Sequence, residues 1–179
     1  MKASNLIENI AFKIANEAVP DEIDLASEMT YAFIEGGEAK KELFQNTEGS
    51  VTGAFGTGEI FVVFPWILEA LSSNAPIIWT LLNSNIIELP SAIKEWIEIY
   101  KTLNSREKKD LLTDDPYKPL KIVVTTVSAE LQSTGLPQEQ CDLITYKVIR
   151  ALLDCPSDSA IFIQKLGGIS NVSGNYRQA

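Results

Sequence analysis

A run of 23 residues, 60–82, carries 16 apolar side chains and a single charged one, Glu69. As one α-helix this run would be about 35 Å long, enough to cross the roughly 30 Å hydrocarbon core of a bilayer. An apolar segment of this length has to be covered, either by lipid or by protein. The run therefore restricts the fold to a membrane span or to a core that other elements surround.

Several features of the run argue against one membrane span. Pro65 and Pro76 each remove a backbone N–H from the helical ladder. Residues 72–74, with the sequence Ser-Ser-Asn, are typical of a turn. The Glu69 carboxylate would cost roughly 3 kcal/mol in lipid. Residues 42–93 also contain no Lys or Arg, whereas a permanent span normally has basic residues near one end.

We interpret the run as a helical hairpin with arms at 65–72 and 75–82. Residues 60–64 are either a short strand or a continuation of the first arm. Arms this short are more typical of buried core helices than of membrane spans, so we expect the hairpin at the centre of a bundle. Insertion into a membrane, promoted by acid or by self-assembly, is the alternative interpretation.

The rest of the chain is predicted to be almost entirely helical, because its apolar residues recur every three or four positions. Residues 122–127 are rich in β-branched side chains, but the period of their apolar positions favours a helix over a strand. Ser4, Asp21 and Ser157 are available as N-caps. Prolines and glycines separate the predicted helices, which cover residues 4–18, 21–35, 38–45, 90–103, 105–112, 116–134, 137–155 and 158–166.

These patterns predict an all-α fold, a single helical bundle of about seven to nine helices around the central apolar hairpin. One domain would span residues 1–168, with an irregular or β segment around 47–64. Residues 169–179 lose the helical period and are predicted to be a loosely ordered tail.

Both ends of the chain have the same order of elements: a helix, a helix opened by proline and a short helix. The prolines are Pro20 and Pro137. This order is consistent with an internal duplication of the outer units. Helical hairpins punctuated by proline are common, however, and they explain the pattern equally well.

Composition excludes several classes of function. The chain has 179 residues, a net charge of -9 and no His, which removes Ser-His-Asp and Cys-His catalysis and every His-containing zinc site. It has no long basic block for nucleic acid. Cys141 and Cys155 lie fourteen positions apart in one predicted helix, about 21 Å along its axis, too far for a disulfide. With no secretory signal in the first residues, we expect a cytoplasmic protein.

Two further patterns invite a binding site, and each has a simpler explanation. Gly53, Gly56 and Gly58 resemble a phosphate loop, but no lysine follows them, so we interpret them as a hinge or tight turn. Acidic pairs such as Asp114-Asp115 lack the spacing of a metal site. We therefore predict no cofactor, no metal and no identified small-molecule substrate.

The functional hypothesis is a non-enzymatic cytoplasmic protein-interaction module, an adaptor or small subunit that binds a protein partner or itself through helix faces. The alternative is a latent membrane-perturbing effector that inserts the apolar hairpin near residues 60–89. An enzyme that uses only carboxylate, Tyr or Lys chemistry is the least favoured class. Under either of the first two hypotheses the candidate contact residues are Phe61, Phe64, Trp66, Ile67, Leu71, Ile78, Trp79 and Leu82.

Overall fold

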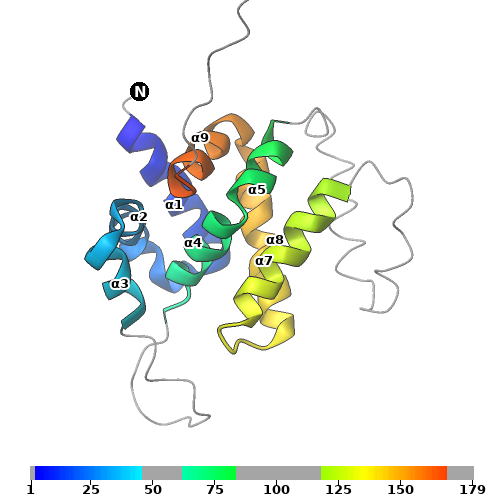
Figure 1. Cartoon of the computed structure of the whole chain (residues 1–179), viewed down its shortest axis with the longest axis horizontal. Coiled ribbons are helices and arrows are strands. Elements are labelled where there is room, and N and C mark those ends of the chain that lie inside the picture. The colour runs from blue at the N-terminus through cyan, green and yellow to red at the C-terminus, as the bar shows by residue number, and fades with distance from the viewer. Residues whose placement is uncertain (1–2, 46–61, 84–117, 169–179) are drawn as a thin grey trace, which may run out of the picture.

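Residues 3–45, 62–83 and 118–168 are described by a computed structural model of the chain (Figure 1). In these residues all regular structure is helical, with eight α-helices, one 3-10 helix (η1) and no strand, which confirms the all-α prediction. The helices are α1 (Ala3–Ala18), η1 (Pro20–Leu25), α2 (Ala26–Glu35), α3 (Gly37–Gln45), α4 (Phe64–Ser73), α5 (Ala75–Leu82), α7 (Lys118–Gln132), α8 (Gln138–Asp154) and α9 (Pro156–Leu166).

The first helix, α1, packs through one apolar face against α8, α2 and α9. Ile10 and Ile14 on that face are buried, as the spacing of three and four residues predicts. The helix ends before Pro20, because the residue that precedes a proline is disfavoured in the α conformation. Gly36 and Gly37, with φ of 76° and 57°, make the turn from α2 to α3 in a region that favours glycine.

The predicted hairpin is not confirmed, because α5 does not fold back on α4. Only Asn74 separates the two helices, with φ -103° and ψ 10°, outside the α-helical region, which marks the kink. Its N–H donates to the Ala70 carbonyl at 3.3 Å, and its own carbonyl accepts the Ile78 N–H at 3.0 Å. A single residue is too short for the loop of an antiparallel helix pair. Figure 1 shows α5 leading onward from the end of α4, so together they form a kinked rod.

The kinked rod is part of the hydrophobic core. Its first half, α4, packs against α2, α7 and α9, and its second half, α5, packs mainly against α9 and α7. One side of each half is almost completely shielded from solvent by these helices, so most apolar side chains of residues 62–82 are covered by protein. The fully buried side chains of the rod include Phe64, Ile67, Leu68, Ala70, Leu71 and Ala75.

The β-branched stretch at residues 122–127 is helical, as its apolar period predicts. Val123, Val127 and Leu131 lie on one buried face of α7. A polar contact also joins α7 to the first turns of α8, where the Asp142 carboxylate accepts a hydrogen bond from the Ser128 hydroxyl at 2.8 Å.

The internal duplication is not confirmed. The short helix of the first unit, α3, has no fully buried residue. Its counterpart in the last unit, α9, buries Phe162 and Ile163 in the core. The second helices also differ, since η1 interrupts the first of them while α8 runs unbroken for 17 residues. The two units therefore pack in different ways.

The three predicted N-caps Ser4, Asp21 and Ser157 are wrong. Helix α1 begins at Ala3, so Ser4 lies inside it. Pro20 opens η1, so the cap position is Val19 and Asp21 lies inside the first turn. Pro156 opens α9 in the same way, which moves the cap to Cys155 and leaves Ser157 inside. The predicted helices at 90–103 and 105–112, the glycine hinge at 53–58 and the tail at 169–179 lie outside the described residues.

Candidate functional site

The structure separates the eight candidate contact residues by exposure. Trp79 is the one that reaches the surface, with 40% of its area exposed, while Trp66 is half-buried. Phe61 lies outside the described residues. The other five are buried in the core and form no surface in this structure: Phe64, Ile67, Leu71, Ile78 and Leu82.

The outer face of α5 is the uncharged surface that sequence reasoning missed in part. It consists of Pro76, Ile77, Trp79, Thr80 and Asn83, all exposed, and we call it the α5 face. Ile77 is 38% exposed, close to the value for Trp79. The signal for Ile77 was present, because the buried side of α5 repeats at the helical spacing and leaves position 77 outside.

The polar groups of the α5 face are turned back onto the helix itself. The Thr80 hydroxyl donates to the Pro76 carbonyl at 2.9 Å. The Asn83 side-chain amide donates to the Trp79 carbonyl at 2.8 Å. Because these donors are already satisfied, the face presents mainly apolar surface to a partner.

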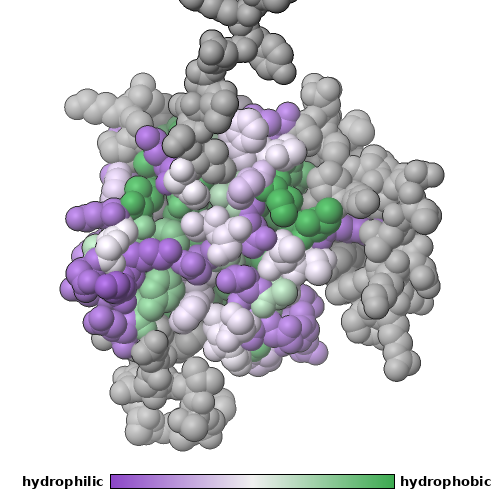
Figure 2. Space-filling model, viewed as in Figure 1, coloured by the Kyte–Doolittle hydropathy of each residue, from purple (hydrophilic) through white to green (hydrophobic). Residues whose placement is uncertain are grey.

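The hydrophobic surface extends from α5 toward a neighbouring helix. Figure 2 shows strongly hydrophobic side chains gathered over α5 and the beginning of α7, with hydrophilic side chains over α2 and α3. On α7 the large apolar residue at the surface is Ile122, which is 39% exposed. The chemistry of this region is apolar contact, without a charged or nucleophilic group on α5.

An aromatic cluster anchors α3 to α4 on another side of the rod. The Phe44 ring contacts Phe33 and Trp66 edge-on, with centroid distances of 6.5 and 4.8 Å. Lys40 Nζ lies 4.0 Å from the Phe33 ring centroid and 2.7 Å from Glu69 Oε2. The single charge of the apolar run is thus neutralised by a lysine from outside the run.

The indole nitrogen of Trp66 departs from the rule that buried polar atoms form hydrogen bonds. Its Nε1 is buried and has no hydrogen-bond partner among the described residues. The ring is packed in the aromatic cluster with α3, so Trp66 contributes to anchoring rather than to a free contact surface.

The start of α4 is capped from a distant part of the chain. The two Glu22 carboxylate oxygens accept the backbone N–H groups of Val63 and Phe64 at 2.8 and 2.7 Å. Burial raises the pKa of Glu22, and these two hydrogen bonds offset part of that rise. The contact spans about forty positions, so no local motif signals it.

Other kinds of site have little support in the described parts of the chain. Residues 3–45, 62–83 and 118–168 contain no group of three acidic or Cys side chains placed to hold a metal ion. Within the same ranges, no helix combines the length and the apolar character needed to cross a membrane.

Comparison with known proteins adds no relative. No protein-family model matches the chain, and neither a curated protein nor a solved structure matches it.

Proposed function

We propose that this protein is a non-enzymatic, cytoplasmic protein-interaction module that binds its partner through the α5 face. The observation that carries the proposal is an exposed helix side with no charge, on which Ile77 and Trp79 remain 38% and 40% exposed. Burying the rest of two such side chains is worth about 1–2 kcal/mol each. Tryptophan is also enriched among the residues that dominate binding at protein interfaces.

The charge of the chain favours a basic partner. The protein carries a net charge of -9, so a second copy would bring a like charge to the interface. A partner with Lys or Arg around an apolar helix face would be attracted instead. We therefore propose an amphipathic helix with basic flanks as the segment that docks on the α5 face.

Calorimetric titration of the purified chain tests this proposal with two synthetic helices of about 18 residues. Both carry the same leucine face, and their polar faces are lysine in one peptide and glutamate in the other. We expect the Leu/Lys peptide to bind and the Leu/Glu peptide to bind at least about tenfold more weakly, because charge repulsion opposes the second complex.

Matched variants locate the binding site. Trp79→Asp and Ile77→Asp should abolish binding while the helical circular dichroism stays unchanged, since both side chains are already at the surface. Leu143→Asp on α8, where Leu143 is 45% exposed, is the control and should bind normally. Equal binding by all three variants would refute the α5 face. A dimer in light scattering that Trp79→Asp dissociates would replace the basic helix with a second copy.

The latent membrane-perturbing effector is the second candidate. It is supported by the low charge of the kinked rod. Within α4 and α5 the charged residue is Glu69, and the lysine that pairs with it, Lys40, lies on another helix. Flotation with anionic liposomes at about pH 7 and pH 5 tests it directly. If the chain floats at either pH and the surface variant Trp79→Asp, which should keep the fold, prevents flotation, the rod inserts and the adaptor proposal loses its main support. A chain that never floats contradicts the membrane function.

A further inference from the structure

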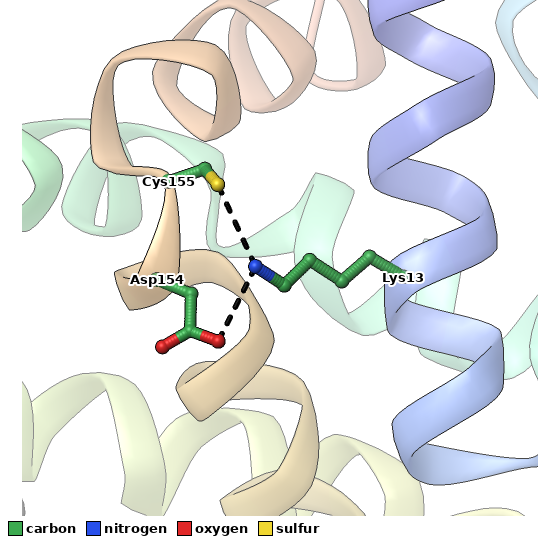
Figure 3. A network of polar contacts seen from close by, with 3 residues as sticks. All are labelled: Lys13, Asp154 and Cys155. Atoms are coloured by element: carbon green, nitrogen blue, oxygen red, sulfur yellow. Dashed lines mark hydrogen bonds and ion pairs between the residues drawn. The ribbon is translucent and has the colours of Figure 1, made fainter.

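A polar cluster joins three helical elements at the boundary between α8 and α9 (Figure 3). Lys13 extends from α1 and places its Nζ 3.2 Å from Asp154 Oδ2, at the end of α8. The same Nζ lies 3.5 Å from Cys155 Sγ, at the residue between the two helices. The cluster therefore brings a cation, a carboxylate and a thiol together at one point.

The lysine of this cluster is held in its charged form. Burial lowers the pKa of Lys13, but its hydrogen bonds and charge interactions with Asp154 and Cys155 outweigh that effect, so the pKa is raised. The same ammonium group donates a hydrogen bond to Sγ, so a charged donor lies directly beside the sulfur.

The two cysteines lie in opposite surroundings. Cys155 is half-buried, and the two side chains of the cluster beside it, Lys13 and Asp154, are 29% and 44% exposed, so the cluster lies at the surface. Cys141 is fully buried, and its thiol donates to the Leu136 carbonyl at 3.6 Å. Burial together with the nearby Asp142 raises the pKa of the Cys141 thiol. Only one of the two thiols is therefore placed for chemistry with a molecule from solution.

We propose that Cys155 is a modification site, at which a small hydroperoxide oxidises the thiol to a sulfenic acid with assistance from Lys13. Sγ attacks one peroxide oxygen, so an S–O bond forms and the O–O bond breaks. The departing oxygen takes the thiol proton and leaves as an alcohol, or as water when the oxidant is hydrogen peroxide. Sulfur loses two electrons and the peroxide gains them.

The product has no second thiol nearby to form a disulfide. Cys141 lies near the other end of α8, fourteen positions away, which corresponds to about 21 Å along the helix. The sulfenic acid should therefore persist and stay available to a trapping reagent. Its oxygen is formed beside the Lys13 ammonium, which can donate a hydrogen bond to it.

The test uses the full chain treated with hydrogen peroxide and then with dimedone, which labels sulfenic acids. Mass spectrometry of peptides measures the label on each cysteine over time. We expect the label on Cys155 and almost none on Cys141. Equal labelling of both cysteines, or no label on Cys155, would overturn the proposal.

Two variants with opposite expected effects separate chemistry from loss of structure. Lys13→Met should slow labelling of Cys155 at least about threefold, because the oxygen that forms on sulfur loses its charged hydrogen-bond donor. Asp154→Asn should accelerate it, because the carboxylate no longer competes for the Lys13 ammonium. Lys40→Met, which removes a lysine from a different ion pair, is the control and should change nothing. The role of Lys13 is refuted if Lys13→Met leaves the rate unchanged, or if Asp154→Asn and Lys13→Met shift it in the same direction.

Discussion

Leu71 illustrates how strongly the core depends on a single side chain of the kinked rod. The residue is completely buried on α4, so Leu71→Ala leaves a cavity and should lower the free energy of unfolding by about 2–5 kcal/mol. Leu71→Asp places an unpaired charge in the core and should prevent folding. Urea denaturation followed by circular dichroism measures both effects.

The control for Leu71 is a leucine that is already in contact with water. Leu143 on α8 is 45% exposed, and Leu143→Ala should change the unfolding free energy by no more than about 0.5 kcal/mol. Similar losses for the two alanine variants would mean that α4 is not packed as described.

Glu22 should make stability depend on pH in a direction opposite to most carboxylates. Its pKa in the folded chain is raised above the ordinary value of 4.5, mainly by burial. The folded state therefore binds the proton more tightly than the unfolded state does. The stabilisation is complete below the unfolded pKa and is lost as pH rises through the folded pKa.

Glu22→Gln isolates this effect, since glutamine does not titrate and keeps one acceptor for the N-terminus of α4. We expect the stability of the unmodified chain, relative to Glu22→Gln, to decrease between about pH 4 and pH 7. Urea titrations of both proteins across this range give the difference. A relative stability that increases with pH would contradict the direction of the shift.

At the scale of helices, α3 should be the element that detaches most easily. It buries no residue completely and is held to α4 through the Phe44 ring and the Lys40–Glu69 ion pair. Phe44→Ala removes the edge-on contacts with Phe33 and Trp66 and should cost about 1–2 kcal/mol. Hydrogen exchange should increase within residues 37–45 and remain unchanged in α8. Phe12→Ala, at a phenylalanine that is 46% exposed, should leave exchange in α3 unaltered.

Helices were the part of the fold that could be predicted from sequence, because the spacing of apolar residues is a local property. The direction of α5 relative to α4 could not be predicted, since it depends on whether residues 72–74 form a loop or stay nearly helical. The capping of α4 by Glu22 could not be predicted either, because Glu22 and the start of α4 are about forty positions apart in the chain. For the candidate site, the sequence pattern correctly identified Trp79 as a surface residue. It also selected Ile78, which is buried, whereas its neighbour Ile77 is the exposed one.

For the whole molecule, charge is unevenly distributed and should make stability sensitive to salt. Residues 3–45 contain nine Asp and Glu against three Lys, whereas residues 118–168 contain five of each sign. Raising NaCl from about 10 mM to 150 mM shortens the screening length from roughly 30 Å to 8 Å. The reduced repulsion should raise the thermal midpoint by about 2–4 °C.

Hydrogen exchange distinguishes the source of that stabilisation. Protection should increase with salt mainly in α1, α2 and α3, where the acidic excess lies, and little in α7 to α9. A midpoint that falls with salt would show that attractive ion pairs outweigh the repulsion.

The packing of α1 against α8 has a consequence for how the chain is made. Translation proceeds at about 5–20 residues per second, and α8 is completed 136 residues after Ala18. For roughly 7–27 seconds the nascent chain therefore carries an N-terminal helix without its largest partner. During that interval the part of the isoleucine face of α1 that α8 covers in the finished fold stays open to water.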